Sequence, residues 1–106
     1  MSIRAVLRYA DGTDGGSVSI SSQSGFETWL EGCRELGLKI VPDFRDIFIV
    51  DSSNERDVLD ELERLDAWFR SYCSSSYELD LQERVSRLTN LVKEIRTHPG
   101  AKVVIV

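Results

Sequence analysis

Carboxylates are concentrated in one segment, residues 51–66, with the sequence DSSNERDVLDELERLD. Its seven acids and two arginines give a local net charge of −5, which equals the net charge of the whole chain. Charge concentrated in this way attracts a basic partner. Asp57 and Glu61 are one helical turn apart, a spacing that could also hold a divalent metal. Because Arg64 lies one turn beyond both Asp60 and Glu61, we expect it to neutralise them, and we predict an acidic surface and no metal site.

The helical phase of this segment separates core positions from a candidate binding face. At about 100° per residue, one stripe is apolar: Val58, Leu62, Leu65 and Phe69. The residues of the adjoining face are Asp57, Asp60, Glu61, Arg64 and Trp68. We predict that the three acids pair with a partner's lysines or arginines, that Arg64 fixes orientation, and that Trp68 is the apolar anchor. The alternative is that Trp68 covers the sheet edge and the acids only solvate a helix.

The sequence contains few residues suited to catalysis or cofactor binding. The single histidine, His98, precedes a proline, where an imidazole is expected to cap helix carbonyls and less so to act as a general base. The chain has no CxxC, HExxH or GxSxG motif. Residues 11–16, DGTDGG, lack the lysine of a P-loop and the closing glutamate of an EF-hand, and they predict a hairpin turn. We therefore expect no enzymatic activity and no cofactor.

Other classes of partner are also disfavoured. Nucleic-acid binding needs a clustered basic face, and Arg4 with Arg8 on one strand face does not supply it. The apolar runs are too short to cross a bilayer, and the start, MSIRAVLRYADG, does not resemble a signal peptide. We expect a cytoplasmic protein that binds neither nucleic acid nor membrane. Cys33 and Cys73 fall on predicted apolar helix stripes, which favours two buried thiols over a disulfide.

The predicted elements form a single domain, residues 1–106, of the α+β class. Residues alternate in facing along 3–9, with Ile3, Ala5, Leu7 and Tyr9 on one face and Arg4, Val6 and Arg8 on the other, which predicts a half-buried strand. This strand and residues 17–22 form an N-terminal hairpin, which leads to a helix between Ser24 and Gly37. A second hairpin pairs 38–41 with 46–50 across Pro42-Asp43, and its second strand is expected to be central.

The second half of the chain predicts two long helices and a final strand. Ser52 or Ser53 opens the acidic helix, with Glu55 in the capping box, and Asp80 with Glu83 opens the next helix. The two helices are expected to pack antiparallel, with the C-terminal KVVIV inside the sheet. The predicted order is ββαββααβ, a mixed sheet of four to five strands covered by three helices.

In size, in its acidic helix NERDVLDELERLD and in its lack of catalytic motifs, the chain resembles the small acidic immunity proteins that neutralise secreted bacterial toxins, including those of contact-dependent inhibition. This resemblance implies a non-enzymatic inhibitor of a cognate toxin, such as a nuclease whose basic active site it would occlude. Two alternatives remain open. One is a homo-oligomeric or regulatory domain that self-associates through its apolar stripes or Trp68, and the other is a small enzyme that uses His98.

Overall fold

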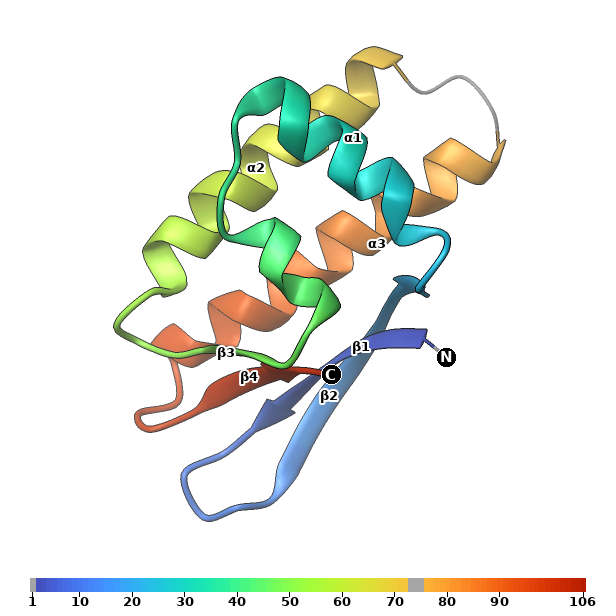
Figure 1. Ribbon diagram of the computed structural model, residues 1–106. Coiled ribbons are helices and arrows are strands. Elements are labelled where there is room, and N and C mark those ends of the chain that lie inside the picture. The colour runs from blue at the N-terminus through green and yellow to red at the C-terminus, as the bar shows by residue number, and fades with distance from the viewer. Residues whose placement is uncertain (1, 73–75) are drawn as a thin grey trace.

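The computed structural model describes residues 2–72 and 76–106, which fold into one sheet and three α-helices (Figure 1). The elements in chain order are β1 (Ser2–Arg8), β2 (Asp14–Ser22), α1 (Phe26–Leu36), the 3-10 helix η1 (Val41–Arg45), β3 (Phe48–Val50), α2 (Glu55–Tyr72), α3 (Ser76–Lys93), the 3-10 helix η2 (Glu94–Arg96) and β4 (Lys102–Ile105). The predicted α+β class is confirmed. Within the described residues, no helix combines the length and the apolar content needed to span a membrane.

The sheet is antiparallel throughout, with strand order β2-β1-β4-β3. The prediction of a mixed sheet was therefore wrong. β4 runs antiparallel to β3 because of the connection between them. The helices α2 and α3 form an antiparallel pair, which returns the chain to the end of the sheet that it left (Figure 1). The following strand then runs opposite to the one before it. The predicted helix pair and the interior position of the C-terminal strand are both confirmed.

The predicted second hairpin does not form, so the order of strands and α-helices along the chain is ββαβααβ. Residues 41–45 form the 3-10 helix η1, with Pro42 in its first turn, where its missing N–H costs no hydrogen bond. Val41 and Phe44 are three residues apart, one turn of a 3-10 helix, and both are buried. Only three residues of the second predicted strand pair with the sheet, and they form its edge. Ile49 is consequently 44% exposed, contrary to the prediction of a central strand buried on both faces.

All three α-helices lie on one face of the sheet (Figure 1), and the core lies between them and that face. The alternation in β1 is confirmed, because Ile3, Ala5 and Leu7 are buried. All four residues of the predicted α2 stripe, Val58, Leu62, Leu65 and Phe69, are buried, and Leu59 and Glu61 are buried beside them. The buried residues described on α3 are Leu81, Val85, Leu88, Leu91 and Val92, and Ile95 of η2 is buried as well. Cys33 is buried as predicted, whereas Cys73 lies outside the described residues.

The C-terminal end of α1 is confirmed, whereas the beginnings of the helices differ from the predicted caps. Gly37 ends α1 in a left-handed conformation, with φ of 72°, as predicted. Ser24 makes no side-chain cap; instead the Ser22 Oγ accepts the Gly25 N–H at 2.9 Å. Asp80 lies inside α3, where it pairs with Arg84 one turn later, at 3.0 Å.

At the start of α2 the predicted capping box is displaced by one residue. The Asp51 Oδ1 accepts the Ser53 N–H, and the Asn54 Oδ1 accepts the Asp51 N–H, both at 2.9 Å. The donors served are the N–H groups of Ser53 and Asp51, whereas the predicted box would have served those of Glu55 and Ser52. The Glu55 carboxylate is thereby left to pair with Arg96, at 3.0 Å.

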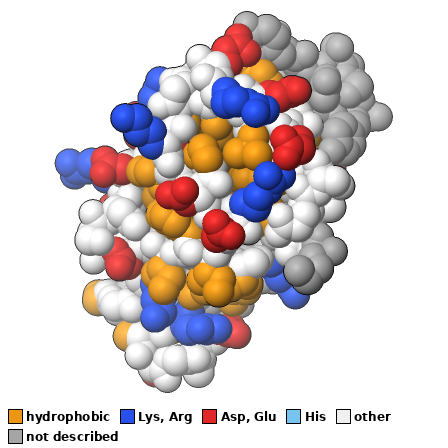
Figure 2. All heavy atoms as spheres, in the orientation of Figure 1, with side chains coloured by type: hydrophobic (Ala, Val, Ile, Leu, Met, Phe, Trp, Pro, Cys, Tyr) orange, Lys and Arg blue, Asp and Glu red, His pale blue; other side chains and the backbone are white. Residues whose placement is uncertain are grey.

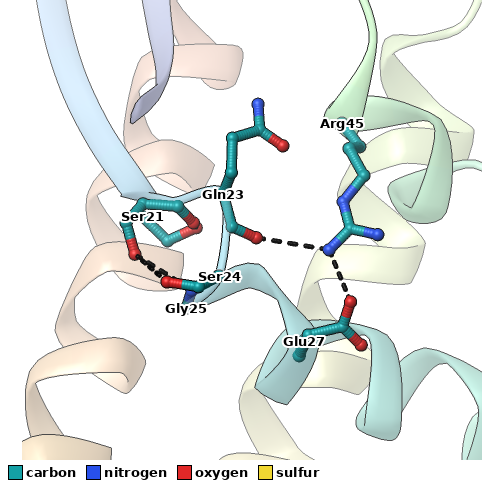
Figure 3. A network of polar contacts seen from close by, with 7 residues as sticks. Ser21, Gln23, Ser24, Gly25, Glu27 and Arg45 are labelled. Atoms are coloured by element: carbon teal, nitrogen blue, oxygen red, sulfur yellow. Dashed lines mark hydrogen bonds and ion pairs between the residues drawn. The ribbon is translucent and has the colours of Figure 1, made fainter. Parts of the chain in front are cut away.

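Arg45 connects η1 to the beginning of α1 (Figure 3). Its Nη2 donates to the Gln23 carbonyl at 3.2 Å and to the Glu27 carboxylate at 2.6 Å. This hydrogen bond and the charge of Arg45 lower the pKa of Glu27. Arg45 thus attaches the end of η1 to α1. The beginning of η1 is attached to α2 through Glu61, as described below.

Candidate protein-binding face on helix α2

The acidic side of α2 and the segment that follows α1 enclose a shallow hollow of about 320 Å³. The lining residues are Gly37, Leu38, Lys39 and Ile40 on one side and Asp57, Asp60, Glu61 and Arg64 on the other. The fold thus brings four of the five predicted site residues together. We call this surface, with those eight residues, the α2 hollow.

Glu61 forms the floor of the α2 hollow and is only 9% exposed. Its carboxylate accepts the N–H of Val41 at 3.0 Å and that of Ile40 at 3.0 and 3.1 Å, with a longer bond of 3.4 Å from Lys39. The first N–H groups of a helix have no partner inside it, so Glu61 caps η1 from the neighbouring helix. Its oxygens therefore serve the fold.

Arg64 forms a second link between the elements around the hollow. Its Nη2 donates to the Leu36 carbonyl at 3.0 Å, in the last turn of α1, where a positive charge also complements the helix dipole. The expected neutralisation of Asp60 and Glu61 by Arg64 is absent from the ion pairs of the described residues. The free carbonyl at the end of α1 offered Arg64 an acceptor that the sequence did not reveal.

Asp57 and Asp60 are the carboxylates that the α2 hollow presents to solvent. Both residues are exposed, and within the described part of the chain neither lies within 4 Å of a cationic nitrogen. Asp57 occupies the first turn of α2, a position where negative charge is favourable. Their charge is not used by any internal ion pair of the described residues, which leaves it available to a partner.

Trp68 lies outside the α2 hollow, in the contact between α2 and α1. Its Nε1 donates to the Glu35 carboxylate at 3.0 Å, and its ring meets Phe69 edge-on at 5.3 Å. A Cβ at Gly32 would lie 2.8 Å from this ring, so the absence of a side chain there allows the close approach. The partly buried Trp68 thus covers α1, whereas the alternative interpretation had placed it over the sheet edge. Its role as a partner anchor stays a prediction.

Much of the acidity of residues 51–66 is used within the fold. Asp51 accepts hydrogen bonds from Ser53, which lower its pKa, and Asp66 pairs with Arg70 at 2.9 Å. With Glu55 and Glu61 also engaged, the exposed acids are Asp57, Asp60 and Glu63, and Glu63 faces a different hollow, towards α3. Figure 2 shows acidic and basic side chains interspersed on this side of the molecule, without a continuous acidic field.

The remaining reactive groups are His98 and Cys33. His98 Nε2 lies 3.1 Å from the Glu94 carboxylate, and the His98 ring lies edge-on to the Tyr9 ring, with 5.1 Å between their centroids. Neither of these contacts is the predicted cap on helix carbonyls. Burial raises the pKa of the Cys33 thiol to about 12. Among the described residues, no three His, Cys, Asp or Glu side chains are placed to hold a metal ion.

Comparison of the chain with protein-family models, curated proteins and solved structures gave no match. The functional inference therefore depends on the chain's own residues.

Proposed function

We propose that this chain is a non-enzymatic protein-binding domain that engages a basic partner through Asp57 and Asp60. The observation that supports this most directly is that both carboxylates are exposed at one hollow and lack an ion pair among the described residues. Most other acids of residues 51–66 are used inside the fold. Charged groups with no structural task, held on a regular helix, are suited to recognition.

The surroundings of these two acids favour a defined binding geometry. Glu61 and Arg64 attach α2 to η1 and to α1, so the walls of the hollow are fixed before binding. Such preorganisation reduces the conformational entropy lost on association. Lys39 and Arg64 also line the hollow and would repel a misplaced cation, directing the partner's guanidinium or ammonium groups towards Asp57 and Asp60.

For the identity of the partner, we propose the toxic domain of a secreted bacterial toxin against which this chain confers immunity in the cytoplasm. The support is the resemblance in size and in the acidic helix. In a nuclease toxin, Asp57 and Asp60 would occupy the positions of substrate phosphates and thereby occlude the active site. Glu61 supports this surface from beneath, and Trp68 stabilises the adjoining contact between α1 and α2.

The test is binding to the purified toxin domain encoded beside this gene. We expect the double variant Asp57→Lys/Asp60→Lys to lose at least about tenfold in affinity, since reversing charges at a complementary contact costs more than 1.4 kcal/mol. The matched control is Glu31→Lys/Glu63→Lys, which changes the net charge equally at exposed positions outside the α2 hollow.

Equal affinity of the two double variants would contradict the assignment of this surface. Absence of a neighbouring toxin gene, or of protection when the chain is co-expressed with that toxin, would contradict the immunity function. Milder variants, Asp57→Asn/Asp60→Asn, provide the same comparison if charge reversal impairs folding, because asparagine preserves the side-chain volume.

A further inference from the structure

The second face of the sheet, opposite the three α-helices, is not covered by any described element (Figure 1). The strands alternate, so the residues between the buried ones point to this side. We call it the open sheet face, and its central residues are Arg4, Val6 and Arg8 of β1, Lys102 and Val104 of β4, and Ile49 of β3.

An apolar row crosses the open sheet face. The strand register places Val6 opposite Val104, and Val104 opposite Ile49. Residues directly opposite on antiparallel strands have their Cβ atoms about 4.5–5.5 Å apart, so these three side chains form one continuous strip. None of the three is fully buried, and Ile49 is 44% exposed.

Basic residues border this row on both sides. Arg8 lies opposite Lys102 on one side of the strip, and Arg4, two residues before Val6, lies on the other. Arg8 pairs with Asp14 at 3.1 Å, and the charge of Lys102 contributes to lowering the pKa of Asp51, so two acids lie at the rim of this face. Neither Arg4 nor Lys102 has an ion-pair partner within 4 Å among the described residues. A chain with a net charge of −5 therefore has a locally cationic sheet face with an apolar centre.

We propose that the open sheet face docks an amphipathic helix of another protein, with its apolar stripe on Val6, Val104 and Ile49 and acidic residues on both flanks. Those acids would pair with Arg4 on one side and Lys102 on the other. The width fits, because Arg4 and Arg8 are four residues apart along β1, about 13 Å, and a helix that crosses the strands between them is about 10–12 Å across with its side chains. The docked helix would complete a third layer over the sheet.

Charge and composition distinguish this occupant from two others. Two copies packed through their open sheet faces would bring Arg4, Arg8 and Lys102 of both copies together, and like charges repel. A single-stranded nucleic acid would be held mainly by stacking on aromatic side chains, but the central row consists of Val6, Val104 and Ile49.

The experiment uses two synthetic helical peptides of roughly 14 residues, about 21 Å long, with the same leucine stripe and with either glutamate or lysine on the flanks. Amide chemical shifts of the full chain are recorded during titration. We expect the glutamate peptide to shift the resonances of β1 and β4, and the lysine peptide to have no effect there. Arg4→Glu/Lys102→Glu should weaken binding about tenfold, while the control Arg56→Glu/Lys93→Glu should not.

Equal shifts with both peptides, no shifts, or shifts confined to the helices would overturn the proposal. Shifts of β1 and β4 by a thymidine oligonucleotide, without any from the glutamate peptide, would overturn it in favour of nucleic acid. This surface is independent of the α2 hollow, so Asp57→Lys/Asp60→Lys should leave the peptide titration unchanged.

Discussion

Replacing Glu61 with alanine should release η1 from α2. The carboxylate accepts three successive backbone N–H groups, those of Lys39, Ile40 and Val41. Alanine retains the helix but cannot reach these donors. The change therefore isolates the contribution of one side chain that connects segments about twenty residues apart in the sequence.

The expected loss in the free energy of unfolding follows from the surroundings of the three N–H donors. Val41 is fully buried, and leaving a buried donor unsatisfied costs about 1–3 kcal/mol. The amide of the partly buried Ile40 adds a smaller cost, and that of the exposed Lys39, already at 3.4 Å, can bond to water. We expect a loss of about 2–4 kcal/mol in the free energy of unfolding. Glu61→Gln should cost less, about 1–2 kcal/mol, because one acceptor oxygen remains.

Urea denaturation measures this loss, with the slope m compared to show that the unfolded reference state is unchanged. The matched control is Glu63→Ala on the same helix, where an exposed carboxylate should change stability by less than about 0.5 kcal/mol. Hydrogen exchange at Ile40 and Val41 should accelerate in the Glu61 variants alone. If Glu61→Ala unfolds at the same urea concentration as Glu63→Ala, the capping role of this carboxylate is refuted.

Two further predictions concern the chemistry of single groups. Because burial raises the pKa of Cys33 to about 12, its thiol should react with a disulfide reagent at pH 8 only as the protein unfolds; rapid labelling of a folded Cys73→Ser variant would contradict this. Arg45 lowers the pKa of Glu27, so this carboxylate contributes stability above its ordinary pKa of 4.5, and that contribution is lost as pH falls through the lower folded value. Glu27→Gln should therefore be less stable than the parent at pH 7, and its stability should approach that of the parent in more acidic solution. A difference in stability between the two that did not change with pH would contradict the pairing of Glu27 with Arg45.

Periodic patterns in the sequence predicted the parts of the fold in which one face is buried. Alternation identified β1, and the helical stripe from Val58 to Phe69 gave the buried face of α2. The continuous apolar run of residues 103–106 correctly indicated an interior strand. Each of these features depends on neighbours within the same element, which a local pattern can reveal.

The segment between α1 and β3 could not be predicted in the same way. Its apolar residues Leu38, Ile40 and Val41 resemble a short strand, but Val41 and Phe44 are buried with 3-10 spacing. Pro42 was the available signal, since proline favours the first turn of a helix as well as a turn.

The helical phase identified the residues of the candidate site, but it did not predict the contacts that each of them makes in the fold. The phase placed Asp57, Asp60, Glu61 and Arg64 on one face, and the structure brings all four to the α2 hollow. It could not show that Glu61 meets backbone amides of η1, because that contact exists only after α1 and α2 have packed.

Whether Asp57 and Asp60 attract a basic partner is tested by the association rate constant with the neighbouring toxin domain, measured at low and at physiological ionic strength. The parent chain should associate faster at low salt, by about tenfold or more, because the interaction of exposed charges is screened over about 8–10 Å. The variant Asp57→Lys/Asp60→Lys should associate more slowly and lose most of that salt dependence, while Glu31→Lys/Glu63→Lys retains it. If both double variants associate at the same rate and with the same salt dependence, the partner does not recognise the α2 hollow.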